Sequence, residues 1–151
     1  MQTLDDKIKN LLSDFENCWS RAKPTELISL WDTSEREPYY IAEEVFDPMY
    51  SWPELKMYWS TAESLLSKFM IQTSEPMYKN ISEHLTVLNF YMHWDALLKE
   101  RGALPIGLDV RVSCILKHIE QKLFFIHYVE SPLGALPYLK STYQNNVRSQ
   151  F

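Results

Sequence analysis

The chain has 151 residues, of which 46% are hydrophobic and 23% charged, and a formal net charge of −5. This length and composition predict one globular domain spanning residues 1–151. The acidic balance and the absence of a Lys/Arg run argue against a nucleic-acid partner, and no apolar run is long enough to cross a membrane. We expect a cytoplasmic protein in which Cys18 and Cys114 are buried thiols.

Three helices are predicted in the first half of the chain. One begins with Pro24 near its start, and another begins at the capping sequence Ser51-Trp52-Pro53-Glu54 and runs to about Ser67. The N-terminal helix follows Thr3, a suitable N-cap. Its apolar residues recur at helical spacing: Leu4, Ile8, Leu11, Leu12, Phe15 and Trp19.

Strands are predicted at Tyr39–Val45, at Phe69–Thr73 with an interruption at Pro76, and at His84–Leu97. Helices followed by strands indicate an α+β fold with the helices on one face of an antiparallel sheet. The His84–Leu97 strand is apolar on both faces, so the outer face of the sheet also needs a cover. A second copy of the chain would provide it, which predicts a homodimer through the sheet face.

A closing hairpin is predicted within Asp109–Leu139, turning about Glu120-Gln121. An even-numbered loop would place Arg111 opposite Glu130, Ser113 opposite Tyr128 and Cys114 opposite His127. Arg111 and Glu130 would then form a cross-strand ion pair. Alternatively, Arg111 binds an anionic ligand group or orients Glu130 as a base.

Two further positions could carry acid–base chemistry. His127 would lie on an apolar face, where it is either a core histidine or a neutral general base. Glu43 and Glu44 are adjacent on a predicted strand, so one of them should point inward. That carboxylate could accept a hydrogen bond from Tyr58 or Trp59, or form a salt bridge with a loop residue such as Arg36. No metal-ligand spacing, phosphate loop or dinucleotide motif occurs, so we expect no metal and no cofactor.

Three segments resemble the SnoaL-like branch of the nuclear transport factor 2-like superfamily: LWDTSEREPYYIAEEV (Leu30–Val45), SWPELKMYW (Ser51–Trp59) and the closing hairpin DVRVSC…FFIHYVESPLGALPYL (Asp109–Leu139). The resemblance implies a cone-shaped, curved antiparallel sheet wrapped by three N-terminal helices. The superfamily includes isomerases, dehydratases, polyketide cyclases and non-catalytic binding or association modules, so the fold alone does not name a function.

The ketosteroid isomerases of this superfamily use a Tyr on the first helix as oxyanion donor and an Asp at the end of the first strand as base. An ungapped pairing of this chain with them places Phe15 at the donor position and Ala42 at the base position. Neither side chain can donate a hydrogen bond or accept a proton. A slip of one or two residues would bring Glu43 or Glu44 to the base position.

Two functions therefore stay open. The first is a cofactor-free isomerase, cyclase or dehydratase that acts on an apolar, cyclic metabolite in the cone; the second is a non-catalytic module that binds a small apolar ligand or a protein. For the enzyme we predict His127 with Glu43 or Glu44 as the catalytic groups. The predicted ligand-binding residues are Trp19, Tyr40, Tyr58, Trp59, Arg111, Tyr128 and Glu130.

Overall fold

The computed structural model describes residues 2–133, 144 and 147. Three helical elements and five strands follow one another along this part of the chain. They are α1 (Leu4–Ser20), the 3-10 helix η1 (Pro24–Leu30), β1 (Tyr39–Ile41), α2 (Trp52–Leu65), β2 (Leu66–Asn80), β3 (Leu85–Leu98), β4 (Ile106–Ile119) and β5 (Lys122–Pro132). None of these helices is long and apolar enough to cross a membrane.

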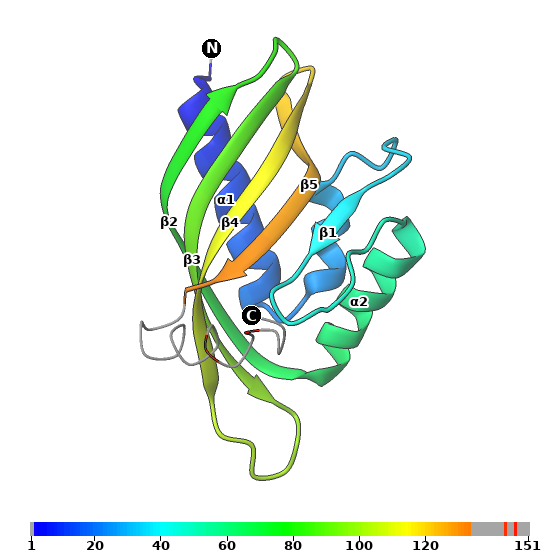
Figure 1. Cartoon of the computed structure of the whole chain (residues 1–151), viewed down its shortest axis with the longest axis vertical. Coiled ribbons are helices and arrows are strands. Elements are labelled where there is room, and N and C mark those ends of the chain that lie inside the picture. The colour runs from blue at the N-terminus through cyan, green and yellow to red at the C-terminus, as the bar shows by residue number, and fades with distance from the viewer. Residues whose placement is uncertain (1, 134–143, 145–146, 148–151) are drawn as a thin grey trace.

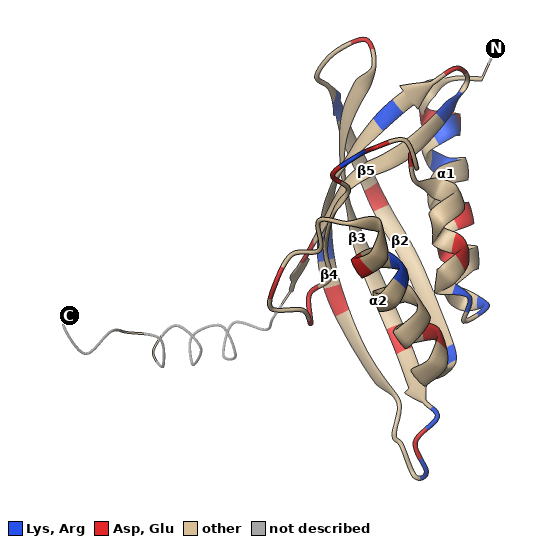
Figure 2. Cartoon of the chain, turned by 90° about the vertical axis from the view of Figure 1, so that its right-hand side faces the viewer, with Lys and Arg blue, Asp and Glu red and all other residues tan. Residues whose placement is uncertain are grey.

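The strands form one curved sheet in the order β1-β5-β4-β3-β2, with α1 running across its inner face (Figure 1). The view turned by 90° shows α1 and α2 on the same side of the sheet (Figure 2). The predicted α+β cone with three helices is therefore confirmed. The sheet is mixed rather than purely antiparallel, because β1 pairs with β5 in parallel while the other neighbours are antiparallel.

Local capping explains where the two α-helices begin. The Thr3 hydroxyl accepts from the Asp6 backbone N–H, and the Asp6 carboxylate accepts from the Thr3 N–H in return. At α2, the Ser51 side chain caps the Glu54 N–H. The face predicted for α1 is the buried one and packs into the core through Ile8, Leu11, Leu12, Phe15, Cys18 and Trp19.

The strands depart from the predicted boundaries at two places. β1 ends at Ile41, so that Glu43 and Glu44 lie in a turn and not on a strand. β2 continues past Pro76 to Asn80, because a register shift between Ser74 and Met77 accommodates the proline. The last part of the segment predicted to hold the closing hairpin, residues 134–139, lies outside the described residues.

A β-bulge in β5 decides which side chains enter the cone. The turn at Glu120-Gln121 lies where we predicted it, and Ile119 pairs with Lys122 and Leu116 with Phe125. The register then shifts by one residue, so that Ile115 pairs with His127 and Cys114 with Tyr128. The predicted pairs beyond this point are therefore wrong. Ile126 is the extra residue of the bulge, and it exchanges the inward and outward positions of everything that follows in β5.

Candidate active site

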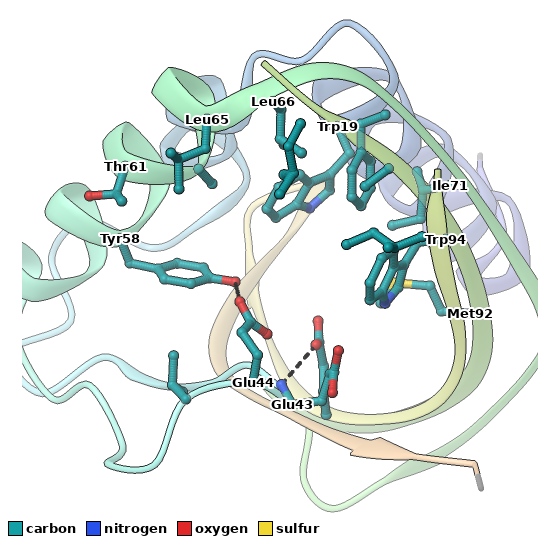
Figure 3. Close-up of a pocket in the computed structure, with 17 residues that line it drawn as sticks. Trp19, Glu43, Glu44, Tyr58, Thr61, Leu65, Leu66, Ile71, Met92 and Trp94 are labelled. Carbon is teal, nitrogen blue, oxygen red and sulfur yellow. Dashed lines mark hydrogen bonds between the residues drawn. The ribbon is translucent and has the colours of Figure 1, made fainter. Parts of the chain in front are cut away.

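A cavity of about 380 Å³ opens between the inner face of the sheet, α2 and the C-terminal end of α1 (Figure 3). Most of its wall is apolar, and its polar groups are gathered on one side. The lining residues are Trp19, Glu43, Glu44, Val45, Tyr58, Thr61, Ala62, Leu65, Leu66, Phe69, Ile71, Met92, Trp94, Ala96, Leu98, Ile106 and Glu130. This is the form of a small-molecule site: a largely apolar hollow with a few convergent polar groups.

Glu130 is the most strongly perturbed carboxyl group in the cavity. β5 directs it inward because, after the bulge at Ile126, the even-numbered residues of this strand face the interior. Its carboxylate accepts from the Tyr128 hydroxyl at 2.8 Å and from the Glu43 backbone N–H at 3.2 Å. The pKa of Glu130 is raised to about 7, because desolvation, helped by the charges of Glu44 and Glu43, outweighs the opposing effect of these two hydrogen bonds.

Glu43 and Glu44 both reach the cavity, whereas the sequence predicted that only one would. The turn frees them from the strict alternation of a strand. The Tyr58 hydroxyl on α2 donates to Glu44 at 2.6 Å, one of the two partnerships that the sequence suggested. Burial raises the pKa of Glu43, and the neighbouring charge of Glu44 adds to this.

The predicted aromatic wall divides into two layers. Trp19 and Tyr58 line the cavity, while Tyr40, Trp59 and Tyr128 are fully buried behind it. Tyr40 stacks on Tyr128 with ring centroids 4.9 Å apart. Tyr128 therefore acts on the cavity through its hydrogen bond to Glu130, and Tyr40 supports the ring of Tyr128.

His127 does not lie where we predicted it. The bulge turns it to the outer side of the sheet, where its ring stacks on Tyr39 with centroids 4.4 Å apart. Burial against this ring lowers the pKa of His127, as we expected of an apolar environment. Only the direction of the pKa shift matches the prediction: the predicted cavity-facing position is wrong, and His127 does not line the cavity.

Arg111 also lies outside the cavity. It is exposed on the outer face of β4 and pairs across the strands with Ser131. The predicted ion pair with Glu130 is not formed, because the two residues project from opposite faces of the sheet. No Lys, Arg or His occurs among the described residues that line the cavity.

The cavity residues of β2 and β3 were not predicted from the sequence as site residues. Ile71, Met92 and Trp94 form the wall opposite Tyr58 (Figure 3), and Phe69 also lines the cavity. Met92 and Trp94 belong to a face recognisable from its alternation, but alternation does not distinguish a packed core from a cavity wall. Within the described ranges, no group of three His, Cys, Asp or Glu side chains is arranged to hold a metal ion.

Solved structures with the same fold align with most of this chain. A nuclear transport factor 2-like superfamily protein from Salmonella enterica serovar Typhimurium is 17% identical, with a TM-score of 0.72 over 85% of this chain and 90% of that one. A candidate scytalone dehydratase from Novosphingobium aromaticivorans is 10% identical, with a TM-score of 0.74 over 85% and 83%.

A third structure, a candidate calcium/calmodulin-dependent protein kinase II association domain from Xanthomonas campestris, is 9% identical, with a TM-score of 0.72 over 89% and 91% of the two chains. No protein-family model matches the chain, and no curated protein matches it in sequence. The chain thus has the nuclear transport factor 2-like fold, which the sequence resemblance implied. At these identities the likeness defines the fold and leaves the function open.

Proposed function

We propose that this chain is a cofactor-independent acid–base enzyme in which Glu130 transfers a proton to and from an apolar substrate. The observation that carries the proposal is the position of Glu130: a carboxyl group in a mostly apolar cavity, with a pKa of about 7 and no cation among the described lining residues. A pKa near the working pH suits a group that must both accept and return a proton. Stable folding does not require such a group, and perturbed carboxyls in cavities are typical of active sites.

The chemistry that fits this arrangement is proton removal from an activated carbon atom. The Glu130 carboxylate takes the proton, and the electrons of the C–H bond move into the substrate to form a double bond. The resulting Glu130 carboxylic acid can return the proton to another carbon, which is an isomerisation. It can instead give the proton to a departing hydroxyl group, which leaves as water in a dehydration. The similarity to a candidate dehydratase is consistent with the second course.

The generic base activity can be tested with 5-nitrobenzisoxazole, a small aromatic carbon acid. Removal of its C3 proton forms a nitrile as the N–O bond breaks, and the released phenolate absorbs visible light. We expect turnover that rises with pH around a midpoint near 7, because only the ionised carboxylate is a base. Glu130→Gln should lower kcat by at least about 100-fold, the usual contribution of a positioned general base.

Glu83→Gln is the matched control, because Glu83 is exposed in the β2–β3 turn and does not line the cavity. It should leave the rate unchanged. Equal rates for the wild type and Glu130→Gln would contradict the proposal that the chain is an enzyme with Glu130 as its base. The same result together with unchanged binding of apolar aromatic compounds would support the non-catalytic binding module instead.

A further inference from the structure

Trp19 presents an indole N–H to the cavity. The residue lies in the last turn of α1 and is only 6% exposed, and none of the hydrogen bonds found among the described residues uses its Nε1. Figure 3 shows its ring nitrogen on the edge that faces the open centre of the cavity. By contrast, Trp52 outside the cavity donates its Nε1 hydrogen to the Glu35 carbonyl at 2.8 Å. A donor that has no protein partner and faces an apolar hollow gains one only from a molecule that enters the hollow.

Apart from the Trp94 indole, the other polar groups of the cavity are acceptors, already donate elsewhere, or point away from it. Glu43, Glu44 and Glu130 present carboxyl oxygens. The Tyr58 hydroxyl donates to Glu44, and the Thr61 hydroxyl points away from the cavity centre (Figure 3). Three acidic side chains without a cation among the described lining residues would repel a carboxylate or phosphate ligand. The cavity therefore suits an uncharged molecule with one acceptor atom placed away from the glutamates.

We propose that the Trp19 indole N–H binds an acceptor oxygen, such as a carbonyl, of an uncharged cyclic ligand whose acidic C–H faces Glu130. The inference deepens the proposed function: when Glu130 removes the proton, negative charge develops on that oxygen, and the indole N–H stabilises it. Trp94, the other tryptophan of the wall, is less buried, stacks on Phe69 and carries its nitrogen beside Met92 (Figure 3). Trp19 is therefore the better-placed donor.

The inference can be tested by binding, independently of turnover. The probes are 2-acetylnaphthalene, 2-ethylnaphthalene and 2-naphthoate, which share a ring system and differ in the acceptor and the charge. Indole N–H signals of ¹⁵N-labelled wild-type protein report the contact directly and require no substitution. We expect the Trp19 signal to move downfield with 2-acetylnaphthalene and not with 2-ethylnaphthalene, and we expect 2-naphthoate not to bind at pH 8. An unmoved Trp19 signal, an equal shift with both neutral probes, or tight binding of 2-naphthoate would overturn the inference.

Variants separate this role from that of Glu130. Trp19→Phe should weaken 2-acetylnaphthalene binding about five- to tenfold, the value of one hydrogen bond, and leave 2-ethylnaphthalene unaffected. Trp94→Phe should still bind 2-acetylnaphthalene more tightly than 2-ethylnaphthalene. If this preference is lost in Trp94→Phe, the donor is Trp94 and the inference is overturned. Glu130→Gln should keep the Trp19 signal shift with 2-acetylnaphthalene. If it does, and if the turnover assay shows no dependence on Glu130, the proposed function fails and the binding role of Trp19 stands.

Discussion

The carboxyl group of Glu130 loses solvent when the chain folds, and the structure gives it no cation in return among the described lining residues. Its pKa rises from the ordinary value of 4.5 to about 7. Between these two pH values the folded state holds a proton that the unfolded state has released, so the free energy of unfolding falls as pH rises. Well above pH 7, Glu130 is ionised in both states. The destabilisation of the folded state by the buried carboxylate is then constant, at about 3 kcal/mol from the pKa difference.

We therefore predict that Glu130→Gln stabilises the protein at pH 8 by about 2–3 kcal/mol and leaves its stability unchanged at pH 4, where Glu130 is protonated in both states. Denaturant unfolding at the two pH values measures the difference. A loss of stability at pH 8 would mean that the ionised carboxylate stabilises the fold, which would contradict the desolvation argument.

Tyr128 tunes the acid strength of Glu130. Its hydroxyl donates to the carboxylate at 2.8 Å and favours the ionised form, which keeps the pKa lower than burial alone would make it. Tyr128→Phe keeps the ring that stacks on Tyr40 and removes only the donor. We expect the midpoint of the pH–rate profile to move upward by about one pH unit, because a hydrogen bond to a charged group is worth roughly that much. A midpoint that stays near 7 or falls would show that this hydrogen bond does not control the ionisation.

Among the secondary-structure features, the β5 bulge is one that the sequence could not predict. Periodicity and turn composition located the hairpin, the capped helices and the buried face of α1, because these depend on local chemistry. The bulge adds Ile126 without a glycine or proline to mark it, and it exchanges the faces of the last strand. The bulge lies in a strand that pairs with both β4 and the parallel β1, a tertiary arrangement that local sequence patterns do not encode. Sequence alone could therefore propose Glu130 and His127 as alternatives but could not choose between them.

A partly buried ion pair connects the loop after η1 to β4. Asp32 is 5% exposed and accepts from the Lys117 ammonium at 2.6 Å and from the Ser34 hydroxyl. Burial by itself would raise the pKa of Asp32, but the hydrogen bonds from Lys117 and Ser34 outweigh it and hold the pKa below its usual value. The ionised aspartate therefore stabilises the folded state above about pH 4, and this contribution is lost as pH falls below that value.

Lys117→Met should remove about 2 kcal/mol of stability at pH 7, because it leaves a buried carboxylate without its cation. The loss should be smaller at pH 3, because Asp32 is largely protonated in the unfolded state there and the ionised pair contributes less to stability. Thermal unfolding measures both effects, and Lys122→Met at the exposed start of β5 is the control. Equal losses at pH 7 and pH 3 would show that the Lys117 stem, rather than the charge pair, carries the stability.

The whole molecule presents an outer sheet face that no described helix covers. Half-buried apolar side chains of β3, β4 and β5 gather on it, with a shallow hollow between them. They include Val87, Tyr91, Ile115 and Val129. Arg111 and Ser113 in the hollow would pair with polar groups of whatever covers it. We propose that a second copy of the chain covers this face through an isologous, twofold interface.

Light scattering at micromolar concentration should give twice the 17.9 kDa mass of the chain. Ser113→Lys places a charge at the centre of the face without disturbing the core, since Ser113 is exposed in the single chain. In a twofold dimer the two new ammonium groups would be brought close together and desolvated, so we expect the dimer to dissociate to monomers with the same far-ultraviolet circular dichroism. Ser60→Lys on the exposed surface of α2 should remain dimeric. A wild type of 17.9 kDa, or equal effects of the two substitutions, would show that this face is not the dimer interface.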